Sequence, residues 1–191
     1  MPPAAKPRLA PSRATASLSN SAAAVLGMVA LGARSGYAIR RAAELSLRFF
    51  WALGPPQIYA ELNRLEKAGL IVGHDDSQGR RPRRSYEVTS FGRAALAQWA
   101  TSRQPAPLEL RDPLLLQLFF ADVAGAEDVT ALLARMRERS LEALAAFDEK
   151  IMPAAARTEQ LGFGQPKLVA AFGVALHEFI VNWCDERIDD G

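Results

Sequence analysis

The chain has 191 residues, enough for one or two small domains, and 49% of them are hydrophobic while 23% are charged. This is the composition of a soluble globular protein, and we expect no membrane span because no apolar run approaches about 18 residues. A single cysteine, Cys184, excludes an intrachain disulfide and a cysteine cluster for zinc, and it favours the reducing cytoplasm.

The net charge of +2 hides an uneven distribution along the chain. Residues 1–18 contain three basic side chains and no acidic one, and their four prolines predict a disordered basic tail. Residues 19–104 contain 12 basic and 6 acidic side chains, whereas residues 105–191 contain 8 basic and 15 acidic ones. A basic first half suits a polyanion, because neutralising phosphates releases counterions. The acidic second half would repel DNA and is expected to face solvent or another protein.

Small and apolar residues predict two short helices at the start of residues 19–104. Ser19-Asn20-Ser21 offers caps for a buried helix from Ala22 to Leu31, and Ser35 caps a second helix from about Gly36 to Leu45. The aromatic run Phe49-Phe50-Trp51 that follows is expected to fill a core beneath a loop.

A third helix is expected from Pro56 to Ala68, because proline fits a first turn and Gly69 can close the helix in a left-handed cap. Spacings of four and three place one apolar stripe on its inner side, namely Ile58, Leu62 and Leu65. The opposite arc is polar, contains little acid and carries an aromatic ring; it comprises Gln57, Tyr59, Ala60, Asn63, Arg64 and Lys67.

Two strand-like runs follow, Leu70–His74 and Arg83–Val88, joined by a turn from Asp75 to Pro82. Four arginines lie within five residues at this turn: Arg80, Arg81, Arg83 and Arg84. A charge run alone is usually a solvated surface. A helix followed by a β-hairpin with a basic tip, however, is how a winged helix-turn-helix meets DNA. The helix enters the major groove, and the tip reaches phosphates or the minor groove.

A fourth helix is expected from about Phe91 to Ser102, with an apolar stripe of Phe91, Ala95 and Trp99. The segment Gln104–Pro107 is the clearest break in the chain, so it divides a domain over residues 19–104 from one over residues 105–191.

Three helices are expected in the second domain: from Asp112 to about Asp122, from Glu127 to Ile151, and from Pro166 to Ile188. The second helix has a near-heptad stripe of Val129, Leu132, Leu133, Met136, Ser140, Leu144, Phe147 and Ile151. The third has a stripe of Leu168, Phe172, Ala175, Leu176, Phe179, Ile180 and Trp183. One chain can hardly bury both stripes, so the pattern predicts a partner subunit.

Catalytic and metal-binding patterns are missing from the sequence. It has no phosphate loop, no nucleophile elbow and no histidine–carboxylate set, so we expect neither an enzyme nor a cofactor. His74 and His177 lie 103 residues apart without a carboxylate pair spaced for a metal. Cys184 lies near an apolar stripe and is expected to be a buried thiol, with a redox sensor as the alternative.

Several stretches resemble PadR-type transcriptional regulators. They are Ser35–Ile39, the pair Phe50-Trp51, Gln57–Ile71, and the hairpin end Gly79–Thr89 followed by Gly92. Asp112–Leu116 with Phe119-Phe120-Ala121 is similar to the longer PadR subclass, which has a carboxy-terminal helical dimerisation domain. The resemblance covers about residues 19 to 188.

The resemblance implies a mainly α fold with a small β-hairpin, namely a winged helix-turn-helix domain followed by a helical dimerisation domain. It also implies a cytoplasmic homodimeric repressor that binds double-stranded DNA at inverted repeats and is released by a small molecule, aromatic or phenolic in kind. Trp99 lies about one turn too early for the ligand-stacking indole of the short PadR members, so no effector site is assigned to it.

Most side chains of the expected interface have a chemical role that suits them. Gln57 can pair with adenine through two hydrogen bonds, and Ala60 can contact a thymine methyl group. Tyr59, which matches the family tyrosine, suits a phosphate, as do Arg64 and Lys67. The arginines of the turn should supply most of the salt dependence, although Arg84 has the alternative of pairing inside the hairpin. The competing function is a winged-helix module that docks an acidic protein partner without reading DNA.

Overall fold

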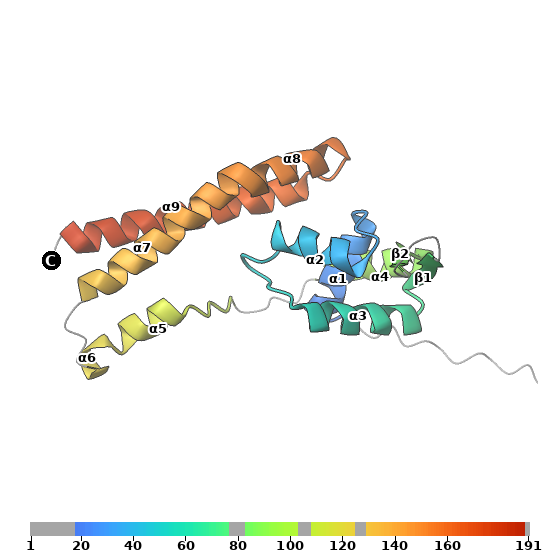
Figure 1. Cartoon of the computed structure of the whole chain (residues 1–191), viewed down its shortest axis with the longest axis horizontal. Helices are drawn as coiled ribbons and strands as arrows, with labels where there is room; N and C mark the ends of the chain where they lie inside the picture. Colours follow the sequence, from blue (N-terminus) through green and yellow to red (C-terminus); the bar gives the residue numbers. More distant parts are fainter. Residues whose placement is uncertain (1–17, 77–82, 103–107, 125–128, 190–191) are drawn as a thin grey trace, which may run out of the picture. The chain divides into compact units, whose positions relative to one another are not determined.

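The computed structural model describes residues 18–76, 83–102, 108–124 and 129–189, which are mainly helical with one two-stranded antiparallel hairpin (Figure 1). This is the expected fold class. The chain divides into two compact units: residues 1–36 with 55–103, and residues 37–54 with 104–191. The segment 37–54, which the sequence pattern grouped with the first domain, is thus assigned to the second unit. The expected basic tail over residues 1–18 lies, apart from Leu18, outside the described residues.

Helix α1 (Asn20–Ala30) is the centre of the first unit and contacts α3, α4 and β2. Ser19 caps it, since the Ser19 Oγ accepts a hydrogen bond from the Ala22 N–H at 3.1 Å. Gly32 follows with φ of 98°, a left-handed conformation that suits glycine. The side chains of Val25 and Leu26 are 0% exposed, as expected for a helix that is apolar on all sides.

The remaining elements of the first unit are α3 (Pro55–Lys67), β1 (Ile71–Asp76), β2 (Arg83–Val88) and α4 (Ser90–Ala100). In the hairpin Ile71 pairs with Val88 and Gly73 with Tyr86. The buried side chains of Ile71 and Tyr86 anchor the sheet, and the Tyr86 N–H donates to the Arg34 carbonyl at 2.7 Å. The hairpin is therefore tied to the chain that leaves α1.

The expected apolar stripe of α4 is not buried within the chain, because Phe91 is 68% exposed and Trp99 39%. Instead α4 approaches the hairpin through Gly92, where a Cβ atom would overlap the Leu70 carbonyl. The partly exposed Trp99 lies beside the start of α1, where its Nε1 donates to Asn20 Oδ1 at 3.3 Å.

In the second unit, α5 (Pro113–Phe119) and α6 (Ala121–Ala124) precede a long helical rod. The rod comprises α7 (Val129–Ala146), a π-helical turn (Phe147–Ile151) and α8 (Met152–Gln160), so it runs nine residues past the expected end at Ile151. Proline inside an α-helix clashes with a carbonyl one turn back. The wider π turn directly before Pro153 gives the chain room to continue as a helix.

Helix α9 (Gln165–Asp189) packs along α7 and α8 (Figure 1). Near α8 the Phe147 ring is 2% exposed and lies 4.5 Å from the Phe49 ring, centroid to centroid. Phe49 thus fills a core as expected, whereas Phe50 and Trp51 are exposed. Further along α9, Cys184 is 0% exposed beside Leu133 and Met136, and burial raises the pKa of its thiol.

The side chains that α9 buries within the unit are mostly small: Ala170, Gly173, Val181 and Cys184. Its large apolar side chains are exposed, among them Leu168, Phe172, Leu176 and Phe179. By length and mean hydropathy alone, 1.3 over its most apolar window, α9 would also suit a bilayer span. Core helices of soluble proteins pass the same test, and α9 packs against two helices of its own chain.

Substituting Gly173 by alanine should destabilise the second unit. A Cβ atom at this position would overlap the buried Phe147 ring, and overpacking typically costs about 1–3 kcal/mol. Gly27 is the matched control: it also lies within a helix but has nothing within 4 Å of a built Cβ, so Gly27→Ala should stabilise by about 0.5–1 kcal/mol. Denaturant unfolding measures both free energies, and equal effects at the two positions would contradict the packing described here.

Asp112 should make the stability of the second unit depend on acid pH. Two hydrogen bonds from Arg139, of 2.8 and 2.6 Å, lower the pKa of the Asp112 carboxyl, which also caps α5. A lowered pKa means that the stabilisation is complete above the unfolded value of 3.8 and is lost as the pH falls through the folded value. Asp112→Asn, which keeps the cap, should lose about 1–2 kcal/mol at pH 7, and thermal melts should show this difference shrinking below pH 4.

Candidate nucleic-acid interface

Helix α3 has one buried side and one exposed side. Ile58 and Leu62 are 0% exposed and Leu65 is 2% exposed, and α1 is one of the elements that α3 packs against. The helix ends at Lys67, and Gly69 follows with φ of 71°, the left-handed conformation that the sequence predicted for its closure. The six side chains proposed to meet DNA are all exposed: Gln57, Tyr59, Ala60, Asn63, Arg64 and Lys67. The helix therefore presents them together to solvent.

Glu61 is an acidic residue on the buried side of α3, beside the apolar stripe. Its Oε1 accepts a hydrogen bond from Arg64 Nη1 at 3.2 Å, three residues along the helix. The Arg64 side chain is still 74% exposed, so its guanidinium is shared between this ion pair and solvent.

Two side chains at the start of α3 are engaged within the unit. The Gln57 Nε2 donates to Ser21 Oγ of α1 at 2.8 Å, so the amide proposed to read a base is held by α1 in the free protein. The Tyr59 phenol lies against Gly36, where a Cβ atom would come within 2.5 Å of the ring. Neither contact has a signal in the sequence, because each joins segments far apart along the chain.

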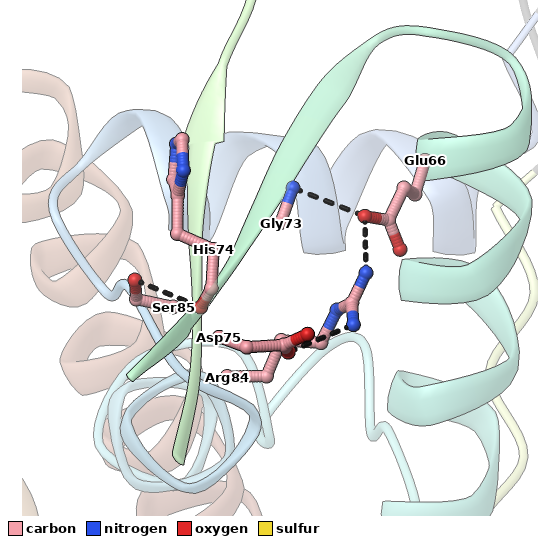
Figure 2. Close-up of polar contacts among 6 residues, drawn as sticks. All are labelled: Glu66, Gly73, His74, Asp75, Arg84 and Ser85. Atoms are coloured by element: carbon pink, nitrogen blue, oxygen red, sulfur yellow. Dashed lines mark hydrogen bonds and ion pairs between the residues drawn. The ribbon is translucent and has the colours of Figure 1, made fainter. Parts of the chain in front are cut away.

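Of the four arginines of the hairpin, Arg84 is the one whose side chain the structure describes. Arg80 and Arg81 lie outside the described residues, and Arg83 begins β2 opposite Asp76. Arg84 is engaged by two carboxylates (Figure 2). Its Nη2 donates to Glu66 Oε1 at 2.7 Å and its Nη1 to Asp75 Oδ1 at 2.9 Å. The hydrogen bond to Glu66 is the main cause that raises the Arg84 pKa.

Glu66 also accepts a hydrogen bond from the Gly73 N–H, at 3.0 Å (Figure 2). A single carboxylate in the last turn of α3 thus holds the backbone of β1 and the side chain of Arg84 in β2. Sequence reasoning did not single out Glu66, because its partners follow only from the pairing register of the hairpin.

A helix with one buried side, followed directly by an antiparallel hairpin and packed against an earlier helix, is the arrangement of a winged-helix domain. Residues 25–98 match the model of the transcriptional regulator PadR-like family, and residues 110–190 match the virulence activator alpha C-terminal model. The first match identifies a PadR-like domain of transcriptional regulators in this chain, and the second match fits the longer PadR subclass.

Named relatives agree with this assignment. The negative transcriptional regulator PadR of Bacillus subtilis is 29% identical over 147 residues, which are 75% of this chain and 79% of that protein. The structure of B. subtilis PadR with operator DNA has a TM-score of 0.72 at 23% identity and covers 88% of this chain and 96% of that one. The Vibrio cholerae virulence activator AphA has a TM-score of 0.65 at 24% identity, covering 90% and 97%.

Proposed function

We propose that the protein is a repressor that binds an inverted-repeat operator as a homodimer and is released by a small aromatic or phenolic molecule. The observation that carries the proposal is the exposed side of α3, next to an arginine-bearing hairpin. Named relatives support it, because B. subtilis PadR is called a negative regulator and its structures contain operator DNA or p-coumaric acid. AphA is called a virulence activator, so the alternative is that this protein activates transcription. Such a regulator works in the cytoplasm.

In this proposal the first turns of α3 read bases in the major groove. Gln57 pairs with adenine through its amide, which first leaves Ser21, and Ala60 contacts a thymine methyl group. Four other side chains of α3 contact the DNA backbone around these positions: Tyr59, Asn63, Arg64 and Lys67. Arg80, Arg81 and Arg83 contact phosphates from the hairpin, where they position the protein without reading sequence.

The homodimer is proposed from the exposed apolar side chains of the second unit. Leu168, Phe172, Leu176 and Phe179 follow one another at helical spacing on α9. In α5 and α6 and the residue between them, Leu116, Phe119, Phe120 and Val123 are also exposed. Monomeric proteins rarely expose contiguous apolar surface of this extent, and a second copy offers the same surface in return.

Base reading by Gln57 can be separated from its structural contact with Ser21. Gln57→Ala should relax the preference at one base pair by about five- to a hundredfold, because one bidentate contact is lost. Ser21→Ala removes only the intramolecular partner and should leave the preference intact. In vitro selection of duplexes, followed by competition binding, gives the preference of each variant. If both variants relax it equally, Gln57 supports the helix and reads no base.

The same binding measurements test the function itself. The wild-type protein should prefer its selected duplex to a random one by about a thousandfold or more, with an affinity that falls steeply as salt rises. Equal affinity for both duplexes would contradict the proposed sequence-specific regulator. It would favour the competing function, a winged-helix module that docks an acidic protein partner.

Phe172→Glu should convert the dimer into a monomer, because a charge in the centre of an apolar interface cannot be solvated. Ala171→Glu is the matched control: it adds the same charge to an exposed position of α9 that lies off the stripe. Sedimentation equilibrium reports the mass of each variant. A wild-type monomer, or a Phe172→Glu dimer, would contradict the proposed interface.

A further inference from the structure

The contacts around Glu66 join three elements of the proposed interface (Figure 2). Glu66 lies in the last turn of α3 and accepts from the Gly73 N–H of β1 at 3.0 Å and from Arg84 of β2 at 2.7 Å. Asp75, the cross-strand partner of Arg84, accepts from the other terminal nitrogen of Arg84 at 2.9 Å. The guanidinium thus spans the two strands and the recognition helix.

The backbone at Gly73 leaves the space that this arrangement needs. A Cβ atom built on Gly73 would lie 2.5 Å from Glu66 Oε1 and 2.7 Å from Arg84 Nε. Any larger residue would push the carboxylate and the guanidinium away from the strand. Gly73 has no positive φ, so its role is space rather than backbone conformation.

We propose that Glu66, Arg84 and Gly73 form a brace that sets the angle between the recognition helix and the hairpin, and that Arg84 is a positioning residue rather than a phosphate contact. The inference rests on the proposed function, because an angle between two DNA-contacting elements matters only when both contact DNA together. A helix in the major groove and a hairpin on the neighbouring backbone must keep a fixed spacing.

The charges in the cluster favour positioning over phosphate binding. Arg84 brings one positive charge, while Glu66 and Asp75 bring two negative charges within hydrogen-bonding distance of it. A phosphate that approached Arg84 would meet both carboxylates and would have to displace well-aligned hydrogen bonds. Because partly exposed ion pairs contribute little to stability, variants of the brace should remain folded.

The two roles of Arg84 predict opposite effects of Glu66→Gln. The brace predicts that this variant and the charge-conserving Arg84→Lys each lower the preference for the selected duplex over a random one by about tenfold. The double variant should be no worse than either single one, since both residues act through one contact. If Arg84 instead binds a phosphate, Glu66→Gln frees it and strengthens binding to both duplexes, with a salt slope steeper by about 0.9.

Glu87→Gln is the matched control. Like Glu66→Gln it removes one negative charge, but Glu87 lies in β2 and pairs with Arg34, outside the cluster. The affinity of Glu87→Gln for DNA shows how much the loss of one negative charge near the interface strengthens binding by itself. The affinity of Glu66→Gln is compared with this value. Gly73→Ala changes no charge and should lower the preference as Arg84→Lys does, while thermal melts confirm that each variant is folded.

The outcomes are distinct. A loss of preference in Glu66→Gln, Arg84→Lys and Gly73→Ala, but not in Glu87→Gln, supports the brace. Unchanged preference in the three variants, or tighter binding of Glu66→Gln than of Glu87→Gln, overturns it. A wild-type protein without sequence preference would contradict the proposed function instead, so the two failures can be told apart.

Discussion

The burial of one side of α3 decides what the first unit can present to a partner. Ile58, Leu62 and Leu65 are withdrawn from solvent, and at 100° per residue their burial directs Gln57, Tyr59 and the neighbouring polar residues outwards. Burying an apolar side chain of this size contributes about 1.5–3 kcal/mol, far more than any exposed contact on the opposite side. The core therefore fixes the orientation of α3, and the residue types on its exposed side can change without loss of that orientation.

The second unit divides its apolar residues by size. Within the chain, α9 packs through Ala170, Gly173 and Cys184, which let it approach α7 and α8 closely, and Phe147 fits over Gly173. The larger Phe172 and Phe179 remain exposed. Small residues suit a close contact between helices of one chain, whereas large exposed rings suit a surface that another copy covers. The same helix can thus be a core element within the chain and part of the proposed interface.

Features governed by local chemistry were predictable from the sequence. The Ser19 cap, the left-handed Gly69 and the buried stripe of α3 depend on neighbours within a few residues, and the structure contains all three. The apolar stripe of α9, which the sequence predicted to be too large for one chain to bury, has Leu168, Phe172 and Phe179 exposed, whereas Ile180 and Trp183 at its far end pack partly within the unit. The Glu66–Arg84 contact could not be predicted, since it depends on strand register.

Charge pairing concentrates the positive potential of the proposed interface at particular places. Arg34 pairs with Glu87, Arg64 with Glu61, and Arg84 with Glu66 and Asp75, so four carboxylates offset three arginines of the first unit. The excess of basic over acidic side chains in residues 19–104 then falls on residues outside these pairs, and Lys67 is one of them among the described residues. Base reading is proposed for the start of α3, where Gln57 is uncharged, and phosphate binding both for other residues of α3 and for the hairpin turn. Because base reading and the phosphate contacts of the hairpin belong to different elements, a stiff connection between the helix and the hairpin is what makes one depend on the other.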